Sequence, residues 1–93
     1  IRLILKHTDM NFLAEGAAVL GGRLKQRFGE RVHGPEVPAL ERVNSLYHRV
    51  VLLKFERALV PADYKILLAE DLTEFGKTDW GKRIRITIDV DPA

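Results

Sequence analysis

Two prolines close together limit what the middle of this 93-residue chain can form. Pro35 and Pro38 lack a backbone N–H, so neither fits the interior of a helix or a central strand. We therefore expect Arg31 to Val37 to form a short strand that lies at a sheet edge or carries a bulge. Ala39 to Leu46 is expected to form an arm or turn, and Tyr47 to Glu56 has the composition of a strong strand.

The first thirty residues predict a strand followed by a helix. From Ile1 to about Thr8, Leu3 and Leu5 alternate with other residues, which is the period of a strand with one buried face. Thr8 or Asp9 then suits the cap of a helix that ends at Gly29. Its apolar residues recur at spacings of three and four and define one face: Leu13, Ala17, Leu20, Leu24 and Phe28. We attribute three glycines that weaken this helix mainly to close packing against the sheet: Gly16, Gly21 and Gly22.

The second half predicts another helix and a last strand. Pro61 suits the first turn of a helix that runs to about Phe75 and stops at Gly76. Its buried stripe would consist of Tyr64, Leu68, Leu72 and Phe75. Lys82 to Val90 alternates apolar with polar residues and predicts a strand buried on one side. The order βαββαβ predicts an α+β ferredoxin-like sandwich, with a four-stranded antiparallel sheet and two helices on one face, similar to a small-subunit ribosomal protein.

Composition limits the classes of protein to consider. The length leaves room for a single domain, residues 1–93. The absence of cysteine excludes disulfides and thiolate chemistry and fits a reducing cytoplasm. No apolar run approaches the roughly 20 residues that span a bilayer. A formal charge of +2 is too small to indicate nucleic-acid binding, so the distribution of cations must decide that question.

One face of the predicted sheet would be left open, because both helices cover the other. An apolar strip of Ile4, Val50 and Leu52 flanked by cations is expected there, and a patch of this kind marks a contact surface. An ordinary solvated sheet with scattered apolar residues is the alternative. The residues expected on this open face include Arg2, Ile4, Lys6, Val50, Leu52, Arg83 and Arg85.

The segment VHGPEVPALERVNSLYHRVVLLK, residues 32–54, and the terminal Asp-Val-Asp-Pro, residues 89–92, carry a resemblance. A Gly-Pro loop, an Arg, a Tyr-x-Arg pair and a Leu-Leu-Lys strand follow in the order found in the C-terminal domain of the PriA family of replication-restart DNA helicases (primosomal protein N′). The resemblance covers essentially the whole chain. It implies a domain excised from a 3′ to 5′ helicase that recognises stalled replication forks and restarts replication through primosome assembly.

The resemblance, together with residue chemistry, indicates DNA contact by four residues. Guanidinium groups pair with phosphate and a tyrosine ring stacks on an unpaired base, so we expect the contacts at Arg42, Tyr47, Arg49 and Lys54. Alternatively, Arg42 and Arg49 brace the Gly34-Pro35 loop and Tyr47 is packing. A second cationic cluster lies near the end of the first helix and consists of Arg23, Lys25, Arg27 and Arg31. These cations either complement the helix dipole at a solvated helix end or contact phosphates.

The family also implies partners and cofactors. Lys65 lies roughly where the family contacts the acidic tail of single-stranded-DNA-binding protein, although Pro61 stands where a cation is expected. Other implied partners are single-stranded or forked DNA, the helicase lobes and primosome proteins, in the bacterial cytoplasm at the nucleoid. This fragment would need no cofactor and would not be an enzyme. The ATP, magnesium and zinc of the parent helicase belong to its other domains.

Competing functions rest on weaker patterns. Asp89 and Asp91 share a strand face, but no third partner completes a catalytic or metal site, and we expect them to end the strand and pair with Arg83 or Arg85. The three histidines lack metal-ligand spacing. An interaction scaffold that packs on helicase lobes without touching DNA remains open. An acylphosphatase-like enzyme would need a Gly-rich phosphate loop after the first strand, and residues 7–11 read His-Thr-Asp-Met-Asn.

Overall fold

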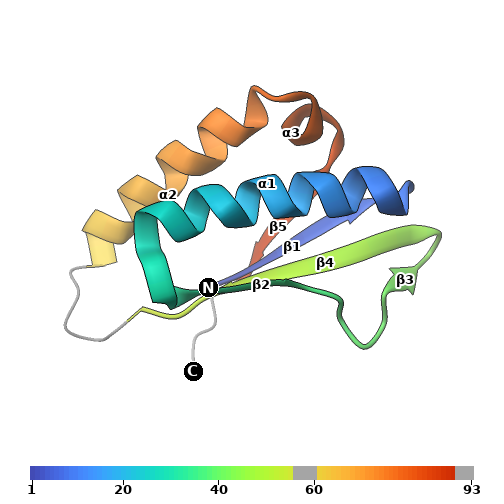
Figure 1. Cartoon of the computed structure of the whole chain (residues 1–93), viewed down its shortest axis with the longest axis horizontal. Helices are drawn as coiled ribbons and strands as arrows, with labels where there is room; N and C mark the ends of the chain where they lie inside the picture. Colours follow the sequence, from blue (N-terminus) through green and yellow to red (C-terminus); the bar gives the residue numbers. More distant parts are fainter. Residues whose placement is uncertain (56–60, 90–93) are drawn as a thin grey trace.

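An antiparallel sheet lies beneath two long helices in the computed structural model, which describes residues 1–55 and 61–89 (Figure 1). The chain is therefore an α+β protein, as expected. In chain order the elements are β1 (Arg2–His7), α1 (Met10–Phe28), the 3₁₀ turn η1 (Gly29–Arg31), β2 (Val32–Glu36), β3 (Arg42–Val43), β4 (Leu46–Leu53), α2 (Pro61–Gly76), α3 (Asp79–Arg83) and β5 (Arg85–Asp89).

The main strands follow the order β2-β4-β1-β5, and every neighbouring pair is antiparallel. The N-terminal strand thus lies inside the sheet, whereas β2 and β5 lie at its ends. The edge position of β2 confirms the prediction from its prolines. The pairing register of β2 with β4 shifts between His33 and Glu36, around Pro35, which confirms the expected bulge.

The sheet contains one more strand than we predicted. Arg42 and Val43, which we placed in an arm or turn, pair with Tyr47 and Leu46 as the short strand β3. Asn44 and Ser45 both have positive φ, 52° and 67°, which suits a tight two-residue hairpin turn. The protruding segment is thus a small hairpin, which we call the β3–β4 arm (residues 37–47).

The first helix begins and ends where its sequence predicts. The Asp9 carboxylate accepts a hydrogen bond of 3.1 Å from the Phe12 N–H, and Gly29 ends the helix at a φ of 63°. All five residues of the predicted apolar face are buried. They pack with β1, β4 and the later elements in one core: Leu3, Leu5, Leu13, Ala17, Leu20, Leu24, Phe28, Val32, Val51, Leu53, Leu68, Phe75 and Ile84.

Two of the three glycines in α1 lie at close contacts. A Cβ at Gly16 would overlap Ile84 Cδ1 and come within 3.0 Å of Trp80 Cβ. A Cβ at Gly21 would lie 2.9 Å from Pro35 Cδ in β2. Gly22 faces open space. The packing explanation is therefore confirmed for Gly16 and Gly21, although Gly16 meets the segment before β5 rather than the sheet itself.

The last predicted strand, Lys82 to Val90, is wrong at its start. Residues 79–83 form the short helix α3, because the Thr78 hydroxyl accepts a hydrogen bond of 3.1 Å from the Gly81 N–H and caps it. The strand begins at Arg85, and Val90 lies outside the described residues. The guanidinium of Arg83 lies 5.9 Å from the centre of the Phe12 ring, so Arg83 is not on the open face.

The other predicted elements differ only in detail. Strand β4, which we predicted from Tyr47 to Glu56, begins at Leu46 and ends at Leu53. Glu56 lies outside the described residues. In the stripe of α2, Leu68 and Phe75 are buried, whereas Tyr64 and Leu72 are half-buried. Across residues 1–55 and 61–89, no helix is both long and apolar enough to cross a membrane.

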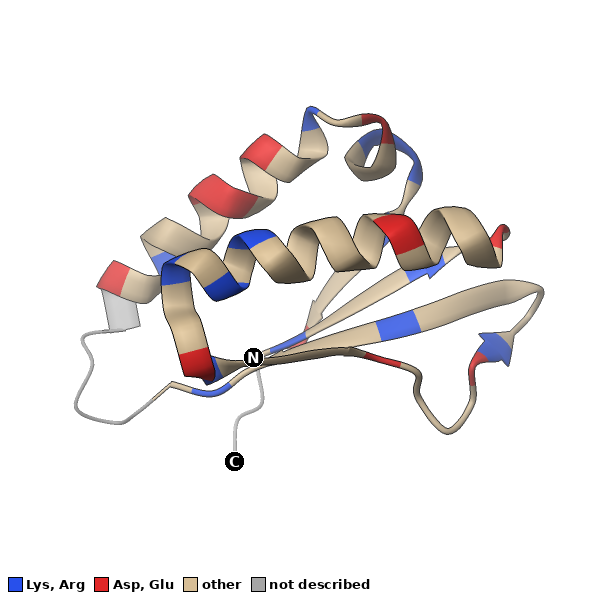
Figure 2. Cartoon of the chain, viewed as in Figure 1, with Lys and Arg blue, Asp and Glu red and all other residues tan. Residues whose placement is uncertain are grey.

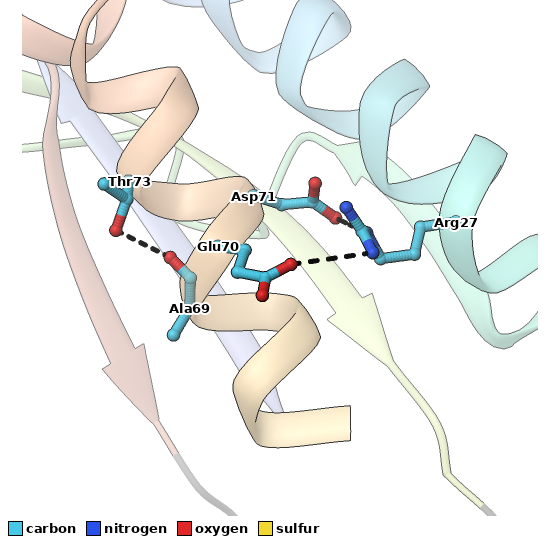
Figure 3. Close-up of polar contacts among 5 residues, drawn as sticks. All are labelled: Arg27, Ala69, Glu70, Asp71 and Thr73. Carbon is cyan, nitrogen blue, oxygen red and sulfur yellow. Dashed lines mark hydrogen bonds and ion pairs between the residues drawn. The ribbon is translucent and has the colours of Figure 1, made fainter. Parts of the chain in front are cut away.

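An ion pair joins the two long helices. Acidic residues lie along α2, and the C-terminal end of the neighbouring α1 carries basic residues (Figure 2). Arg27 Nε donates a hydrogen bond of 2.7 Å to Asp71 Oδ2, and its Nη1 lies 3.9 Å from a carboxylate oxygen of Glu70 (Figure 3). Asp71 is only 3% exposed. Arg27 from the second cationic cluster is therefore already neutralised by α2.

Candidate nucleic-acid interface

The strand pairing of the β3–β4 arm joins two of the four residues predicted to contact DNA. Arg42 and Tyr47 are direct partners in the register of β3 and β4. The Arg42 guanidinium lies 5.3 Å from the centre of the Tyr47 ring, within the range of a cation–π interaction. Arg42 is exposed and Tyr47 is half-buried. A positive charge and an aromatic ring are thus held together at the end of the sheet.

Arg49 has a different environment from its predicted partners. It is only 8% exposed, and its register partner on β1 is the fully buried Leu5. Arg49 Nη1 lies 3.1 Å from Glu41 Oε1 and donates a hydrogen bond of 2.8 Å to the His48 carbonyl. The His48 N–H in turn donates a hydrogen bond of 2.7 Å to the Glu41 carbonyl. Arg49 thus braces the arm that carries Arg42, whereas the expected alternative was a brace of the Gly34-Pro35 loop.

Lys54 lies at the opposite end of β4 from Tyr47. Seven residues of strand correspond to about 23 Å, so one nucleotide cannot touch both residues. The Lys54 side chain is exposed, and its backbone N–H donates a hydrogen bond of 2.8 Å to the Arg31 carbonyl. The four predicted residues therefore do not form one cluster. Arg42 and Tyr47 contact each other, Arg49 is buried, and Lys54 lies at the far end of β4.

The strand register determines which side chains share the open face. Leu3 and Leu5 are fully buried beneath the helices, so the alternate residues of β1 and their register partners face the other way. The sheet order then gives three cross-strand rows. They are His48–Lys6–Arg85, Val50–Ile4–Thr87 and Leu52–Arg2–Asp89. Six of the seven residues predicted for the open face lie on it, and Arg83 does not.

The first of these rows, His48–Lys6–Arg85, is the most cationic, and we call it the basic row. It crosses three strands at the end of the sheet beside the β3–β4 arm, because His48 directly follows Tyr47. Among residues 1–55 and 61–89, neither Lys6 nor Arg85 forms an ion pair. Within this part of the chain, nothing neutralises either cation, and both can bind an external anion.

The other two rows carry no net charge. Ile4, Val50 and Leu52 form the predicted apolar strip, and all three are half-buried. Arg2 Nη2 lies 2.8 Å from Asp89 Oδ2 across the sheet. The expectation that Asp89 pairs with Arg83 or Arg85 is therefore wrong, because its register partner is Arg2. Asp91 lies outside the described residues.

The remaining candidates do not join this surface. Lys65 is exposed on α2, on the other side of the sheet from the basic row. At the end of β1, His7 Nδ1 accepts a hydrogen bond of 2.9 Å from the Asp9 N–H. No group of three or more histidine and acidic side chains within the described residues is placed to hold a metal ion.

Sequence reasoning missed two parts of this region. It did not assign a role to Glu41, the partner of Arg49, because nothing in the residue types predicts an ion pair across a loop. It also did not align His48 with Lys6 and Arg85. The alternation of side chains along a strand predicts which face of the sheet a residue occupies. Only the pairing register shows which residues of neighbouring strands stand opposite each other.

Comparison with known proteins adds no relative. The chain matches no protein family model, no curated protein and no solved structure.

Proposed function

We propose that this chain is a noncatalytic nucleic-acid-binding domain that captures single-stranded or forked DNA at the basic row and the adjoining β3–β4 arm. The observation that carries the proposal is that Lys6 and Arg85, without ion-pair partners among the described residues, lie at the same end of the sheet as the paired Arg42 and Tyr47, which project from its other face. Cations held beside an aromatic ring are the combination that binds a backbone and stacks a base.

The proposed mechanism separates two tasks. Phosphates bind the basic row by charge, in exchange for condensed counterions. A base of the same strand then passes around the end of the sheet and stacks against the Arg42–Tyr47 pair, in which Arg42 lies over the ring and Tyr47 packs against the core. Arg49 acts indirectly, because its contact with Glu41 holds the arm in place. Lys54 would contact only a longer strand that crosses the sheet.

The proposal includes a fold family and a parent protein. The strand order β2-β4-β1-β5, with α1 and α2 on one side, supports a ferredoxin-like sandwich. The Gly-Pro bulge in β2 and the Tyr-x-Arg pair in β4 support the C-terminal domain of a PriA-like helicase that restarts replication at stalled forks. In that assignment the parent protein works in the bacterial cytoplasm. Its other domains use ATP, magnesium and zinc, and its partners include primosome proteins and single-stranded-DNA-binding protein at Lys65.

The test is fluorescence anisotropy of a labelled single strand and a labelled forked duplex, titrated with the domain at several salt concentrations. Binding is expected to weaken with salt, with a slope of about 0.7 per phosphate contacted. The variants Lys6→Ala and Arg42→Ala should each lower the affinity, and Lys6→Ala should also lower the salt slope by about 0.7. Tyr47→Phe keeps the ring and should bind like the wild type, whereas Tyr47→Ala should not.

Lys25→Ala is the matched control, because Lys25 is an exposed cation on α1 away from the sheet. Its effect reports the loss of one general positive charge. Equal losses for Lys25→Ala and Lys6→Ala would refute a localised site. Circular dichroism of each variant checks that the fold is intact.

A docking scaffold is the second candidate, favoured by the apolar strip of Ile4, Val50 and Leu52 between the charged ends of the open face. A neighbouring domain that covers this strip would not require DNA contact. Absence of binding to either DNA at low salt, with an intact fold, would favour the scaffold and refute the DNA-binding proposal.

A further inference from the structure

The two edges of the main sheet differ in how they are protected. At one end, Pro35 removes a donor from β2 and the register shift bends the strand, which are both devices that prevent edge-to-edge pairing. At the other end, β5 contains no proline and pairs in an unbroken register with β1. Among the described residues, no strand pairs with its outer side. This edge is therefore able to accept another strand.

The sequence of β5, Arg-Ile-Thr-Ile-Asp, is complementary to itself when reversed. In an antiparallel pair of two copies centred on Thr87, Arg85 of the first copy stands opposite Asp89 of the second. Asp89 of the first copy likewise stands opposite Arg85 of the second. Ile86 stands opposite Ile88 in the same way. Opposite charges face each other on the open side and isoleucines face each other on the helix side, which are favourable cross-strand pairs.

Ile88 also lacks a complete cover in the single chain. It faces the helix side, because its register partner is the fully buried Leu3, yet it is 50% exposed. Helix α1 packs on β1, β2 and β4, so it leaves this edge of the sheet less covered. Ile86 from a second copy would lie beside Ile88 and reduce its contact with water.

We infer that the chain forms a two-fold symmetric dimer through antiparallel pairing of β5 with β5 of a second copy. The four main strands of each copy then form one continuous sheet of eight strands. Asp89 already lies 2.8 Å from Arg2 of its own chain, so it would stand between that arginine and Arg85 of the second copy. A single pair of short strands buries less than a stable interface of about 1,200–2,000 Å², so the dimer is expected to be weak and concentration-dependent.

Charge reversal gives a sharp test by sedimentation velocity of the chain over a range of concentrations, without nucleic acid. Wild type should shift from monomer towards dimer as concentration rises. Arg85→Asp and Asp89→Arg should each remain monomeric, because each places like charges opposite each other twice. An equal mixture of the two variants should dimerise again, because every facing pair then has opposite charges. A misfolded variant would not show this recovery.

Two further variants complete the experiment. Thr87→Lys places two lysines together at the symmetry axis and should abolish the dimer without altering either charged residue. Lys25→Asp reverses a charge on α1 and should dimerise like the wild type. A wild type that stays monomeric at every concentration, single variants that dimerise normally, or a mixture that stays monomeric would each overturn the inference. A monomeric wild type would leave the β5 edge for a strand from a different protein.

The dimer and the DNA-binding proposal are tested by separate measurements, although Arg85 takes part in both and would stand opposite Asp89 of the second copy in the dimer. Thr87→Lys and the variant mixture report only on self-association. Lys6→Ala and Arg42→Ala change residues outside β5 and report on DNA. Failure of one proposal therefore leaves the other to be judged on its own measurement.

Discussion

Replacement of Gly16 by alanine should destabilise the protein even though alanine is the better helix former. The new methyl group would overlap Ile84 Cδ1 and come within about 3.0 Å of Trp80 Cβ. Gly22 lies in the same helix and faces open space, so Gly22→Ala gains helix propensity without a clash. Both substitutions gain up to about 1 kcal/mol from propensity. The difference in unfolding free energy between the two variants therefore measures the effect of packing alone.

Overpacking of a core costs about 1–3 kcal/mol, so Gly22→Ala should exceed Gly16→Ala in unfolding free energy by about that amount. Each kcal/mol corresponds to roughly 4–8 °C in melting temperature for a domain of this size. The measurement is urea unfolding followed by circular dichroism and by the fluorescence of Trp80, the only tryptophan.

A double variant tests the cause directly. Ile84→Val removes Cδ1, the atom that the new methyl group would overlap, so Gly16→Ala should cost less in that background than in the wild type. Equal stability of the Gly16→Ala and Gly22→Ala proteins, or the same cost of Gly16→Ala in both backgrounds, would refute the packing explanation.

Two further predictions concern polar contacts. Asp71→Asn weakens the link to Arg27 and should cost about 2 kcal/mol by urea unfolding, because the Asn oxygen can still accept the hydrogen bond but the negative charge that faces the guanidinium at a buried site is lost. Glu70→Gln is the control and should change stability by less than about 0.5 kcal/mol, since Glu70 is exposed and 3.9 Å from the guanidinium. Asp9→Ala removes the cap of α1 and should cost about 1 kcal/mol, whereas Asp9→Asn should cost only a few tenths. Equal effects of the paired variants would contradict these assignments.

Local patterns were enough to predict most elements of this fold. Helix α1 has the bounds that its apolar spacing and its caps indicate, from Met10 to Phe28. The edge position of β2 followed from Pro35, and the buried side of β1 followed from the alternation of Leu3 and Leu5 with other residues. These features depend on residues that are near each other in the chain, so local sequence patterns are enough to predict them.

The errors arose where one local pattern competed with another. Alternation from Lys82 onwards predicted a strand, but the cap at Thr78 favours a helical turn through Arg83. This moved Arg83 away from the open face. The role of Arg49 could not be predicted, because its burial depends on Glu41, which reaches it from the arm. The basic row needed the register of three strands, which alternation does not provide.

The order of the strands has a consequence for how this chain reaches its folded state. Of the strands described here, β1 leaves the ribosome first, but its partners are β4 and β5, and Arg2 pairs with Leu52 and Asp89. The first strand therefore waits for half of the chain before it gains one neighbour and for nearly all of it before it gains the second. Contacts so distant in sequence slow folding, because the long loop must close before they stabilise anything. Until then, the exposed Leu3 and Leu5 are a site at which nascent chains would associate, and α1, which needs only local contacts, is the element able to shield them.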